Sequence, residues 1–286
     1  MSHMAKKGRK YSNVYKAMNF FQRLKNRIVT NIQLTSLGDR WHDKLMVFVF
    51  SFWFPIKKRI GVGLSVQKGK KIRLKKFGRP FLFIVRSGLD FEVLREVFIK
   101  EEYACDIAEL PHTIFDLGSN IGASVAYFAL KYPAANIFAF EPDPNNIPYL
   151  KRNTAQFERV RQFPYAVTDN DSDVILYADS EKSLSSSIML CRSGQKRVNV
   201  VGRSLDSLID EFSINKIDLL KFDIEGAELK VFSSFTRWDI FRCIVGEVHL
   251  DLMKGSLGEL KNILSSFHVN LTKLSEHRYI LFAVKK

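Results

Sequence analysis

Eight consecutive residues carry the strongest signal in this sequence: Phe115-Asp116-Leu117-Gly118-Ser119-Asn120-Ile121-Gly122. They continue an apolar segment at 113–117 that has the length of a short strand, and they precede a segment at 123–131 that is expected to be a helix. Glycine at 118 and 122 lets the backbone pass close to a ligand, because no Cβ stands in the way. This order of strand, glycine turn and helix indicates the first unit of an open α/β sheet.

The loop also indicates a class of ligand. Dinucleotide sites carry G-x-G-x-x-G at this place, so that a helix N-terminus faces the pyrophosphate. Here only two glycines remain, and Asp116 adds a carboxylate before the first of them. That combination favours a cationic ligand without phosphate, such as S-adenosylmethionine, over NAD. Taken alone, the loop is also compatible with an ordinary tight turn.

Two more acidic residues follow predicted strands. Glu141 comes directly after the strand expected at 136–140, where its carboxylate can accept hydrogen bonds from both hydroxyls of a ribose. Asp223 comes directly after the strand expected at 218–222. Ligands of open α/β sheets collect at the carboxyl ends of the strands. We therefore expect Asp116, Glu141 and Asp223 to meet in one crevice.

Strand and helix patterns alternate from residue 113 to the C-terminus. This alternation predicts a doubly wound, mostly parallel seven-stranded sheet with helices on both faces, closed by a C-terminal hairpin. The expected strands are 113–117, 136–140, 160–167, 218–222, 243–248, 269–274 and 279–284, and a short alternating run at 174–178 lies in the less regular region 168–203. The expected helices are 123–131, one capped by Asp143 with Pro144 in its first turn, 205–212, 227–235 and 256–266.

Charge divides the chain near residue 88. Residues 1–88 hold 21 Lys and Arg with two acidic residues, which leaves 23 basic and 28 acidic residues in 89–286. The first part is therefore +19 and the second −5, although the whole chain is +14. We expect a basic N-terminal extension at 1–88 and the main α/β domain at 89–286. Such an extension attracts polyanions, namely phospholipid headgroups, nucleic acid or acidic glycans.

The extension also has recognisable segments. Apolar spacing predicts a helix over 13–33, an aromatic run covers 48–54, basic strands are expected within 61–86, and an amphipathic helix over 89–100. The longest nonpolar run, 45–56, has 12 residues. About 20 are needed for a membrane-spanning helix, so no span is expected.

The remaining compositional features concern location. We expect no signal peptide, because no uncharged apolar stretch with a cleavage site follows the basic start. Cys105, Cys191 and Cys243 form no CxxC pair, which argues against a disulfide scaffold or a structural zinc site. We expect a cytoplasmic protein, peripheral on the cytoplasmic face of a membrane.

Four phrases together resemble the FkbM family of S-adenosylmethionine-dependent methyltransferases: FDLGSNIGASVAYFA, FAFEPDPNNIPYLKRN, IDLLKFDIEGAELKVF and IVGEVH, which begin at residues 115, 138, 217 and 244. The resemblance runs from about Phe81 to the C-terminus. It implies a Rossmann-like class I methyltransferase fold and O-methylation of a hydroxyl on a sugar, glycan, glycolipid or secondary metabolite. Residues 1–80 lie outside it.

The resemblance also implies a cofactor site for S-adenosyl-L-methionine. The glycine loop would hold the methionine end, Glu141 the ribose, and the segment after the third strand, Tyr165 included, the adenine. Asp223 would face the amino-acid portion or the acceptor. The residues expected to bind the cofactor are Asp116, Gly118, Ser119, Asn120, Gly122, Glu141, Pro142, Ala166, Val167, Asp169 and Asp223.

The expected catalytic residues are His249, Asp223 and Glu225. His249 is the candidate base, since an imidazole titrates near neutral pH and an alcohol acceptor must lose a proton. Glu247 could orient it or bind a hydroxyl, and Glu228 is interpreted as a helix N-terminal charge. Asp223, Glu225 and His249 could instead bind a divalent cation, but the spacing does not demand one, so no metal is predicted.

Three functions remain open at this stage. The first is an O-methyltransferase acting on a glycan or glycolipid acceptor at an anionic membrane surface, through residues 1–88. The second is an RNA methyltransferase with the basic extension as a clamp. No RRM, KH or OB signature accompanies the charge, so nucleic acid is the less favoured partner. The third is a non-catalytic binding module, against which the intact glycine loop argues.

Overall fold

The computed structural model describes residues 28–29, 31–60, 69–105, 107, 109–178, 187–189 and 195–286, with the backbone alone over 52–60. Most of the helix predicted over 13–33, the residues 61–68 and Cys191 lie outside the described residues. Cys105 and Cys243 are buried free thiols, as expected of small apolar residues.

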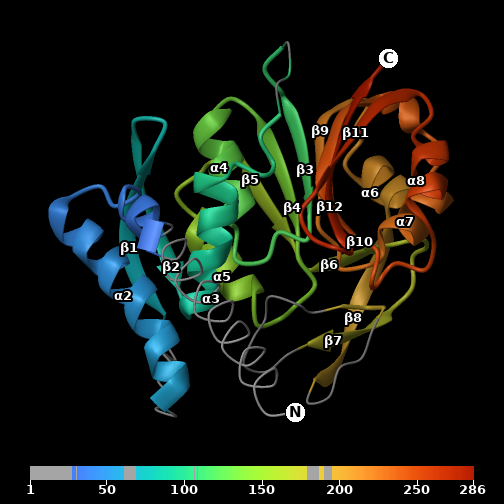
Figure 1. Cartoon of the computed structure of the whole chain (residues 1–286). Helices are drawn as coiled ribbons and strands as arrows, with labels where there is room; N and C mark the ends of the chain where they lie inside the picture. The colour runs from blue at the N-terminus through green and yellow to red at the C-terminus, as the bar shows by residue number, and fades with distance from the viewer. Residues whose placement is uncertain are drawn as a thin grey trace, which may run out of the picture.

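A seven-stranded sheet forms the centre of the molecule, in the order β11-β12-β10-β9-β3-β4-β5 (Figure 1). Strands β5, β4, β3, β9 and β10 run parallel, and β12 is antiparallel to both β10 and β11. The predicted doubly wound sheet with a C-terminal hairpin is confirmed. The strands are β3 (Thr113–Leu117), β4 (Asn136–Phe140), β5 (Val160–Phe163), β9 (Ile217–Phe222), β10 (Phe241–His249), β11 (Phe267–Lys273) and β12 (Arg278–Lys285).

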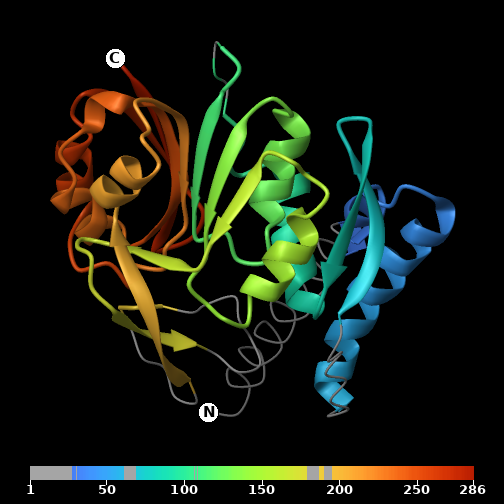
Figure 2. The same cartoon turned by 180° about the vertical axis from the view of Figure 1, so that it is seen from behind.

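Helices cover both faces of this sheet (Figures 1 and 2). Successive residues of a strand point to opposite faces, so Ile114 packs in one hydrophobic cluster and Phe115 in the other. One face carries α3 (Gly88–Leu94) with its π-helical continuation (Arg95–Ile99), α4 (Ala123–Lys131) and α5 (Ile147–Thr154). The other carries α6 (Leu205–Glu211), α7 (Glu228–Ser234) and α8 (Leu257–Ile263).

Two sequence-based expectations about this domain are wrong in detail. The strand expected at 160–167 is two strands, because Pro164 has no N–H for a ladder bond. The second, β6 (Tyr165–Thr168), joins β8 (Lys196–Ser204) and β7 (Val174–Ala178) in a separate three-stranded sheet. The helix after Asp143 begins only at Ile147, since the Asp143 carboxylate accepts a bond from Asn145 N in a turn.

The N-terminal part packs onto the α3–α5 side. Its described elements are α2 (Trp41–Ile60) and a hairpin of β1 (Lys70–Lys76) and β2 (Arg79–Val85). The hairpin turns at Phe77 and Gly78, both with positive φ, as a two-residue turn requires. Phe83 of β2 belongs to the same buried cluster as Tyr127 of α4. The hydrophobic core thus includes residues on both sides of position 88, and the domain boundary there stays a prediction.

The aromatic run lies within α2. One face of this helix, with Asp43, Val47 and Ser51, is buried, while Leu45 and Phe48 are exposed. Within the described part of the chain, no helix combines the length and the apolar character that crossing a membrane requires.

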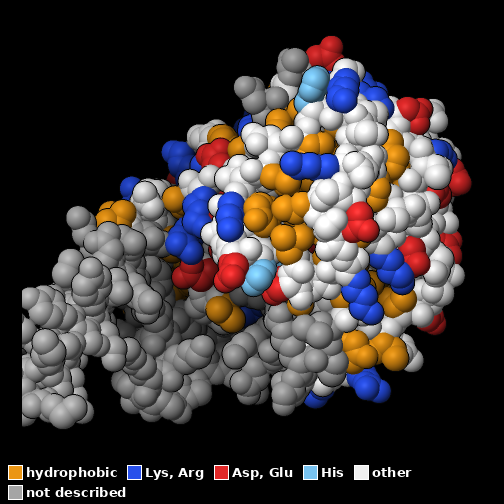
Figure 3. All heavy atoms as spheres, turned by 45° about the vertical axis from the view of Figure 1, so that its right-hand side comes forward, with side chains coloured by type: hydrophobic (Ala, Val, Ile, Leu, Met, Phe, Trp, Pro, Cys, Tyr) orange, Lys and Arg blue, Asp and Glu red, His pale blue; other side chains and the backbone are white. Residues whose placement is uncertain are grey.

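The surface over the C-terminal elements has mixed charge. Figure 3 brings the right-hand side of Figure 1 forward and shows Lys, Arg, Asp and Glu side chains interspersed with small hydrophobic clusters. This agrees with the nearly balanced composition of residues 89–286.

Candidate active site

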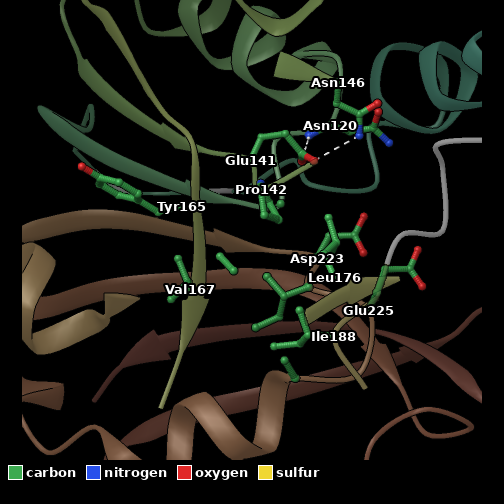
Figure 4. A pocket seen from close by; sticks show the side chains of 14 residues that line it. Asn120, Glu141, Pro142, Asn146, Tyr165, Val167, Leu176, Ile188, Asp223 and Glu225 are labelled. Atoms are coloured by element: carbon green, nitrogen blue, oxygen red, sulfur yellow. Dashed lines mark hydrogen bonds between the residues drawn. The ribbon is translucent and has the colours of Figure 1, made fainter. Parts of the chain in front are cut away.

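A cavity lies at the carboxyl ends of β3, β4 and β9, where the strand order reverses (Figure 4). It encloses about 610 Å³, its open mouth included. That place is typical of ligand sites in open α/β sheets. Its lining consists of Gly118, Asn120, Glu141, Pro142, Asn146, Tyr165, Ala166, Val167, Leu176, Ile188, Asp223, Ile224, Glu225 and Ala227.

The glycine loop between β3 and α4 forms one wall. Gly118 has φ +74°, and a Cβ there would lie 1.9 Å from the carbonyl oxygen of Asp223. Only glycine therefore allows β3 and β9 to approach so closely at their ends. Asn120, also at positive φ, lines the cavity, and its buried Oδ1 has no hydrogen-bond partner among the described residues.

Glu141 comes directly after β4 and contacts the glycine loop at Asn120. Its carboxylate accepts hydrogen bonds from Asn120 N at 2.7 Å and Asn146 Nδ2 at 3.1 Å (Figure 4). It also accepts one from Asp143 N at 3.0 Å. These contacts fix its orientation toward the cavity. Burial raises the pKa of Glu141 to about 7, despite these hydrogen bonds.

Asp223 faces the same cavity from the end of β9. Tyr103, from the segment after α3, donates its hydroxyl to Asp223 Oδ2 at 3.0 Å. The Asp223 side chain is 29% exposed and lines the cavity. The structure thus brings Glu141 and Asp223 together, as predicted.

Asp116 does not reach the cavity wall. Its side chain is fully buried and forms an ion pair with Lys221 Nζ at 3.1 Å. Lys221 also donates to the carbonyl oxygen of Gly118 at 2.7 Å. Burial raises the pKa of Asp116, while the charge of Lys221 lowers it. The expectation that Asp116 lines the cofactor site is therefore wrong, because it lies beneath the glycine loop and supports it.

Three other expected cofactor residues are also absent from the lining. Asp169 forms an ion pair with Lys230 at 2.9 Å. A Cβ at Gly122 would approach Leu150 of α5 at 3.0 Å, so this glycine serves helix packing. Ser119 borders an adjoining cavity. Of the expected set, the cavity is lined by Gly118, Asn120, Glu141, Pro142, Ala166, Val167 and Asp223.

His249 lies at the end of β10 with no exposed side-chain surface. Its Nδ1 is 3.0 Å from Glu228 Oε1. Its Nε2 is 3.5 Å from Glu247 Oε1 and 3.8 Å from both Asp223 Oδ1 and Glu225 Oε2. The three predicted catalytic residues are therefore neighbours, and Glu247 faces the same side of β10 as His249, two residues away.

The imidazole has an unusual charge state. Burial opposes the charged form, but the hydrogen bond to Glu228 and the charges of Asp223, Glu228 and Glu225 raise the pKa of His249 to about 9. Burial, followed by the charge of Asp223, raises the pKa of Glu225 to about 7 and also raises that of Glu247. An imidazole protonated at neutral pH is not in the state that a general base needs, so that role stays a prediction.

Glu228 has a different environment from the one expected. It stands in the first turn of α7, but its side chain is completely buried and contacts His249. The interpretation as a helix N-terminal charge alone is therefore wrong. The contact depends on the packing of α7 against the end of β10, which no local pattern reveals.

Several lining residues were not predicted. Asn146 lines the cavity and donates a hydrogen bond to Glu141. Its position between Glu141 and α5 is the feature of the sequence from which it could have been predicted. Leu176 and Ile188 come from the irregular region 168–203, which carries no motif. Arg278 donates to Glu247 at 3.0 Å from β12, 31 positions along the chain.

Comparison with known proteins agrees with this geometry. The profile described as "Methyltransferase FkbM domain" matches residues 116–281. The chain is 28% identical over 189 residues to 2-O-methyltransferase NoeI of Sinorhizobium fredii, covering 60% of this chain and 75% of that one. It is 28% identical over 130 residues to hexuronic acid methyltransferase AglP of Haloferax volcanii, covering 45% and 52%.

A third relative is 31-O-demethyl-FK506 methyltransferase FkbM of Streptomyces tacrolimicus, 26% identical over 215 residues, with 63% of this chain and 82% of that one covered. The family match spans more than half of the chain and includes β3, β9 and β10, whose ends carry the site. The chain belongs to the FkbM methyltransferase domain family and is an S-adenosylmethionine-dependent methyltransferase.

Proposed function

We propose that the protein methylates a hydroxyl of a sugar, glycan or glycolipid, and that it does so at a membrane surface. The observation that carries the methyl-transfer part is the cavity in which Glu141 and Asp223 face one space across the glycine loop.

The lining fits S-adenosylmethionine. Val167, Leu176 and Ile188 offer an apolar wall for an adenine, and Glu141 can accept hydrogen bonds from the ribose hydroxyls. The unpartnered Oδ1 of Asn120 can accept a hydrogen bond from the ammonium group of the methionine portion.

When bound, S-adenosylmethionine supplies a methyl group already activated on a sulfonium. The tasks left to the protein are to exclude water, to orient the acceptor and to accept its proton. Asp223 and Glu225 lie at the edge that the cavity shares with an adjoining cavity, where Tyr103, Glu247 and Arg278 also lie. Their carboxylates can accept a hydrogen bond from an acceptor hydroxyl and so orient its oxygen.

Relatives support an oxygen acceptor on a carbohydrate. Two of the three names state the methylated oxygen, and the third names a hexuronic acid. The polar cluster beside the cavity suits an acceptor with several hydroxyls better than an apolar one.

Methyl transfer can be tested with labelled S-adenosylmethionine. The full chain is incubated with separate glycolipid, soluble glycan and RNA fractions, with Glu141→Gln as the matched control for cofactor binding. We expect label in an alkali-stable ether of a glycan or glycolipid and none with the variant at low cofactor concentration. Label in RNA alone would replace the proposed acceptor. Failure to bind S-adenosylmethionine in calorimetry would overturn the proposal.

The proposed membrane contact rests on one face of α2. Trp41 is 76% exposed and Leu45 53% exposed, and Phe48 and Val49 lie on the same side of the helix at spacings of four and three to four residues. Residues 1–88 carry +19. Exposed aromatic and aliphatic side chains beside basic groups favour an interfacial helix on an anionic membrane.

Flotation with vesicles tests this contact. We expect the full chain to float with phosphatidylserine vesicles, and the variant Trp41→Ser/Leu45→Ser/Phe48→Ser to float at least about tenfold less. The matched control is Leu110→Ser, which removes a 73% exposed leucine from the α/β domain. Equal flotation of both variants and the wild type would contradict a role for α2.

A further inference from the structure

The nitrogen Nε2 of His249 is the least expected polar atom near the site. The side chain has no exposed surface, and this atom has no hydrogen-bond partner among the described residues. Burying such a group without a partner is costly. From this atom and the carboxylates around it, we propose that Asp223, Glu247 and His249 bind a divalent cation of the Mn²⁺ or Mg²⁺ class.

The ligand atoms are close enough to share one ion. One atom from each of the three residues lies within 4.8 Å of the others. Nε2 is 3.5 Å from Glu247 Oε1 and 3.8 Å from Asp223 Oδ1. Ligands bound at about 2.1 Å from one ion lie roughly 3 to 4 Å apart, so closure requires only small side-chain movements.

A direct ion pair explains these distances less well. Both separations exceed the roughly 2.7 to 3.2 Å of a hydrogen bond from nitrogen to oxygen. The imidazole therefore points between carboxylate oxygens without bonding to any of them. A cation placed between the three side chains would bind Nε2 together with both oxygens, of which Glu247 Oε1 also accepts a hydrogen bond from Arg278 at 3.0 Å.

The surrounding residues hold the ligands in place. Glu228 is fully buried, binds His249 Nδ1 at 3.0 Å and accepts a hydrogen bond from Gly226 N at 3.1 Å. A carboxylate on the far nitrogen is the usual partner of a metal-bound imidazole. Tyr103 occupies Asp223 Oδ2, which leaves Oδ1 on the side of His249.

Charge points the same way. Four carboxylates, those of Asp223, Glu225, Glu228 and Glu247, lie within 4 Å of the one imidazole. Among the described residues, Arg278 is the cationic side chain paired with this cluster, through Glu247. A dication would compensate the remaining negative charge, and carboxylate-rich sites with one imidazole suit Mn²⁺ or Mg²⁺.

The ion would lie between the cofactor cavity and the adjoining cavity, because Asp223 borders both. There it could bind an acceptor hydroxyl oxygen and lower its pKa. His249 would then be a ligand in its neutral form and not the base, because the ion replaces the proton that the imidazole carries in the metal-free protein. This role rests on the proposed function, whereas cation binding itself does not.

Titration of the metal-stripped full chain with Mn²⁺, followed by electron paramagnetic resonance, tests the site. We expect loss of the free-ion signal with one Mn²⁺ bound per chain. Asp223→Asn and His249→Asn should weaken binding at least about tenfold, and Glu228→Gln about 10- to 100-fold. The matched comparison is Glu225→Gln, which removes an equally near carboxylate outside the ligand set and should weaken binding clearly less than Asp223→Asn, because it removes a charge but no ligand.

The outcomes separate the two proposals. No bound Mn²⁺ at millimolar concentration, with S-adenosylmethionine binding intact, would overturn the cation site and leave methyl transfer standing. An equal loss in Glu225→Gln and Asp223→Asn would overturn the ligand set, because general negative charge would then explain the binding. Circular dichroism and a thermal melt confirm the fold of each variant. If a His249 variant fails to fold, Asp223→Asn, which is partly exposed, decides.

Discussion

At the scale of single residues, register and strand ends determine which carboxylates reach the cavity. Asp116 is the fourth residue of the five-residue strand β3 and lies opposite Lys221 of β9, so the two buried charges pair inside the sheet. Asp223 is one residue beyond the end of β9 and therefore turns into the cavity. One carboxylate supports the loop and the other is available to ligands.

Lys221→Met should be strongly destabilising, because it leaves the buried Asp116 carboxylate without its partner. Breaking a buried pair in this way costs about 3 to 5 kcal/mol. We expect the double variant Asp116→Asn/Lys221→Met to recover part of that loss. Urea unfolding of both variants measures this, and a cost below about 1 kcal/mol for Lys221→Met would show that the pair contributes little.

Gly118→Ala should abolish cofactor binding, because its Cβ would lie 1.9 Å from Asp223 O. Gly78 is a suitable control, since it has φ +75° but no atom within 4 Å of an added Cβ. Gly78→Ala should cost about 1 kcal/mol from backbone strain and leave binding unchanged. Calorimetry with S-adenosylmethionine compares the two, and equal affinities would contradict the steric argument.

The raised pKa of Glu141 predicts that the affinity for S-adenosylmethionine depends on pH. Its pKa of about 7 means that the ionised form, which accepts hydrogen bonds from the ribose, is lost as the pH falls below 7. We expect affinity for S-adenosylmethionine to fall about tenfold from pH 8 to pH 6, with a flat profile in Glu141→Gln. Calorimetry at several pH values checks this.

The same shift affects stability in the opposite direction. Because the pKa is raised on folding, Glu141 contributes stability below its ordinary pKa of 4.5 that is lost as the pH rises through 7. The stability of Glu141→Gln relative to the wild type should therefore be greater at pH 8 than at pH 5, because only the wild type loses this contribution. A difference of the opposite sign would contradict the assigned pKa.

At the scale of elements, side-chain amides attach the N-terminal hairpin to the α/β domain. Asn153 of α5 is fully buried, accepts from Ile84 N at 2.7 Å and donates to Ile84 O at 3.2 Å and Ile121 O at 2.9 Å. It thus joins β2, α5 and the glycine loop. Gln156 makes the same pair of bonds to Leu82 of β2, but at the surface.

This pair of amides gives a matched test. Asn153→Ala leaves a buried N–H and two carbonyl oxygens without partners and should cost roughly 2 to 4 kcal/mol. Gln156→Ala exposes its partners to water and should cost less than about 1 kcal/mol. Urea unfolding gives both values, and hydrogen exchange at Ile84 N should accelerate only in Asn153→Ala. Similar costs for the two variants would show that burial of this contact does not matter.

At the scale of the whole molecule, charge and apolar surface are unevenly distributed. Basic residues are concentrated in residues 1–88, where α2 also exposes its apolar face, whereas the C-terminal surface in Figure 3 has mixed charge. An anionic membrane would therefore attract the molecule through α2 and the basic residues. The cavity belongs to the α/β domain and would not take part in this contact.

The proposed membrane contact should depend on salt. The Debye length falls from about 10 Å at 0.1 M to about 3 Å at 1 M, so attraction between the basic region and anionic vesicles weakens as salt rises. We expect flotation to fall several-fold between 0.05 and 0.5 M salt, with the remainder due to the apolar face. Flotation that does not change with salt would argue against a role for the basic residues.

Local sequence patterns were sufficient for the order of strands and helices, for the glycine loop and for the positions of Glu141 and Asp223. Each of these depends on periodicity and turn chemistry within a few residues, so β3, α4 and β4 have the predicted bounds. The break at Pro164 was visible in the sequence, but its effect, the transfer of β6 to another sheet, depends on pairing with β8.

The tertiary structure alone decided which charges meet. The pairing of Asp116 with Lys221 depends on the register of two strands that are about a hundred residues apart, and the surroundings of His249 depend on the packing of α7 and β12 against β10. Long-range register and packing leave no local periodicity in a sequence. For that reason the cofactor cavity could be predicted from the sequence, whereas only the tertiary structure shows the buried imidazole among four carboxylates.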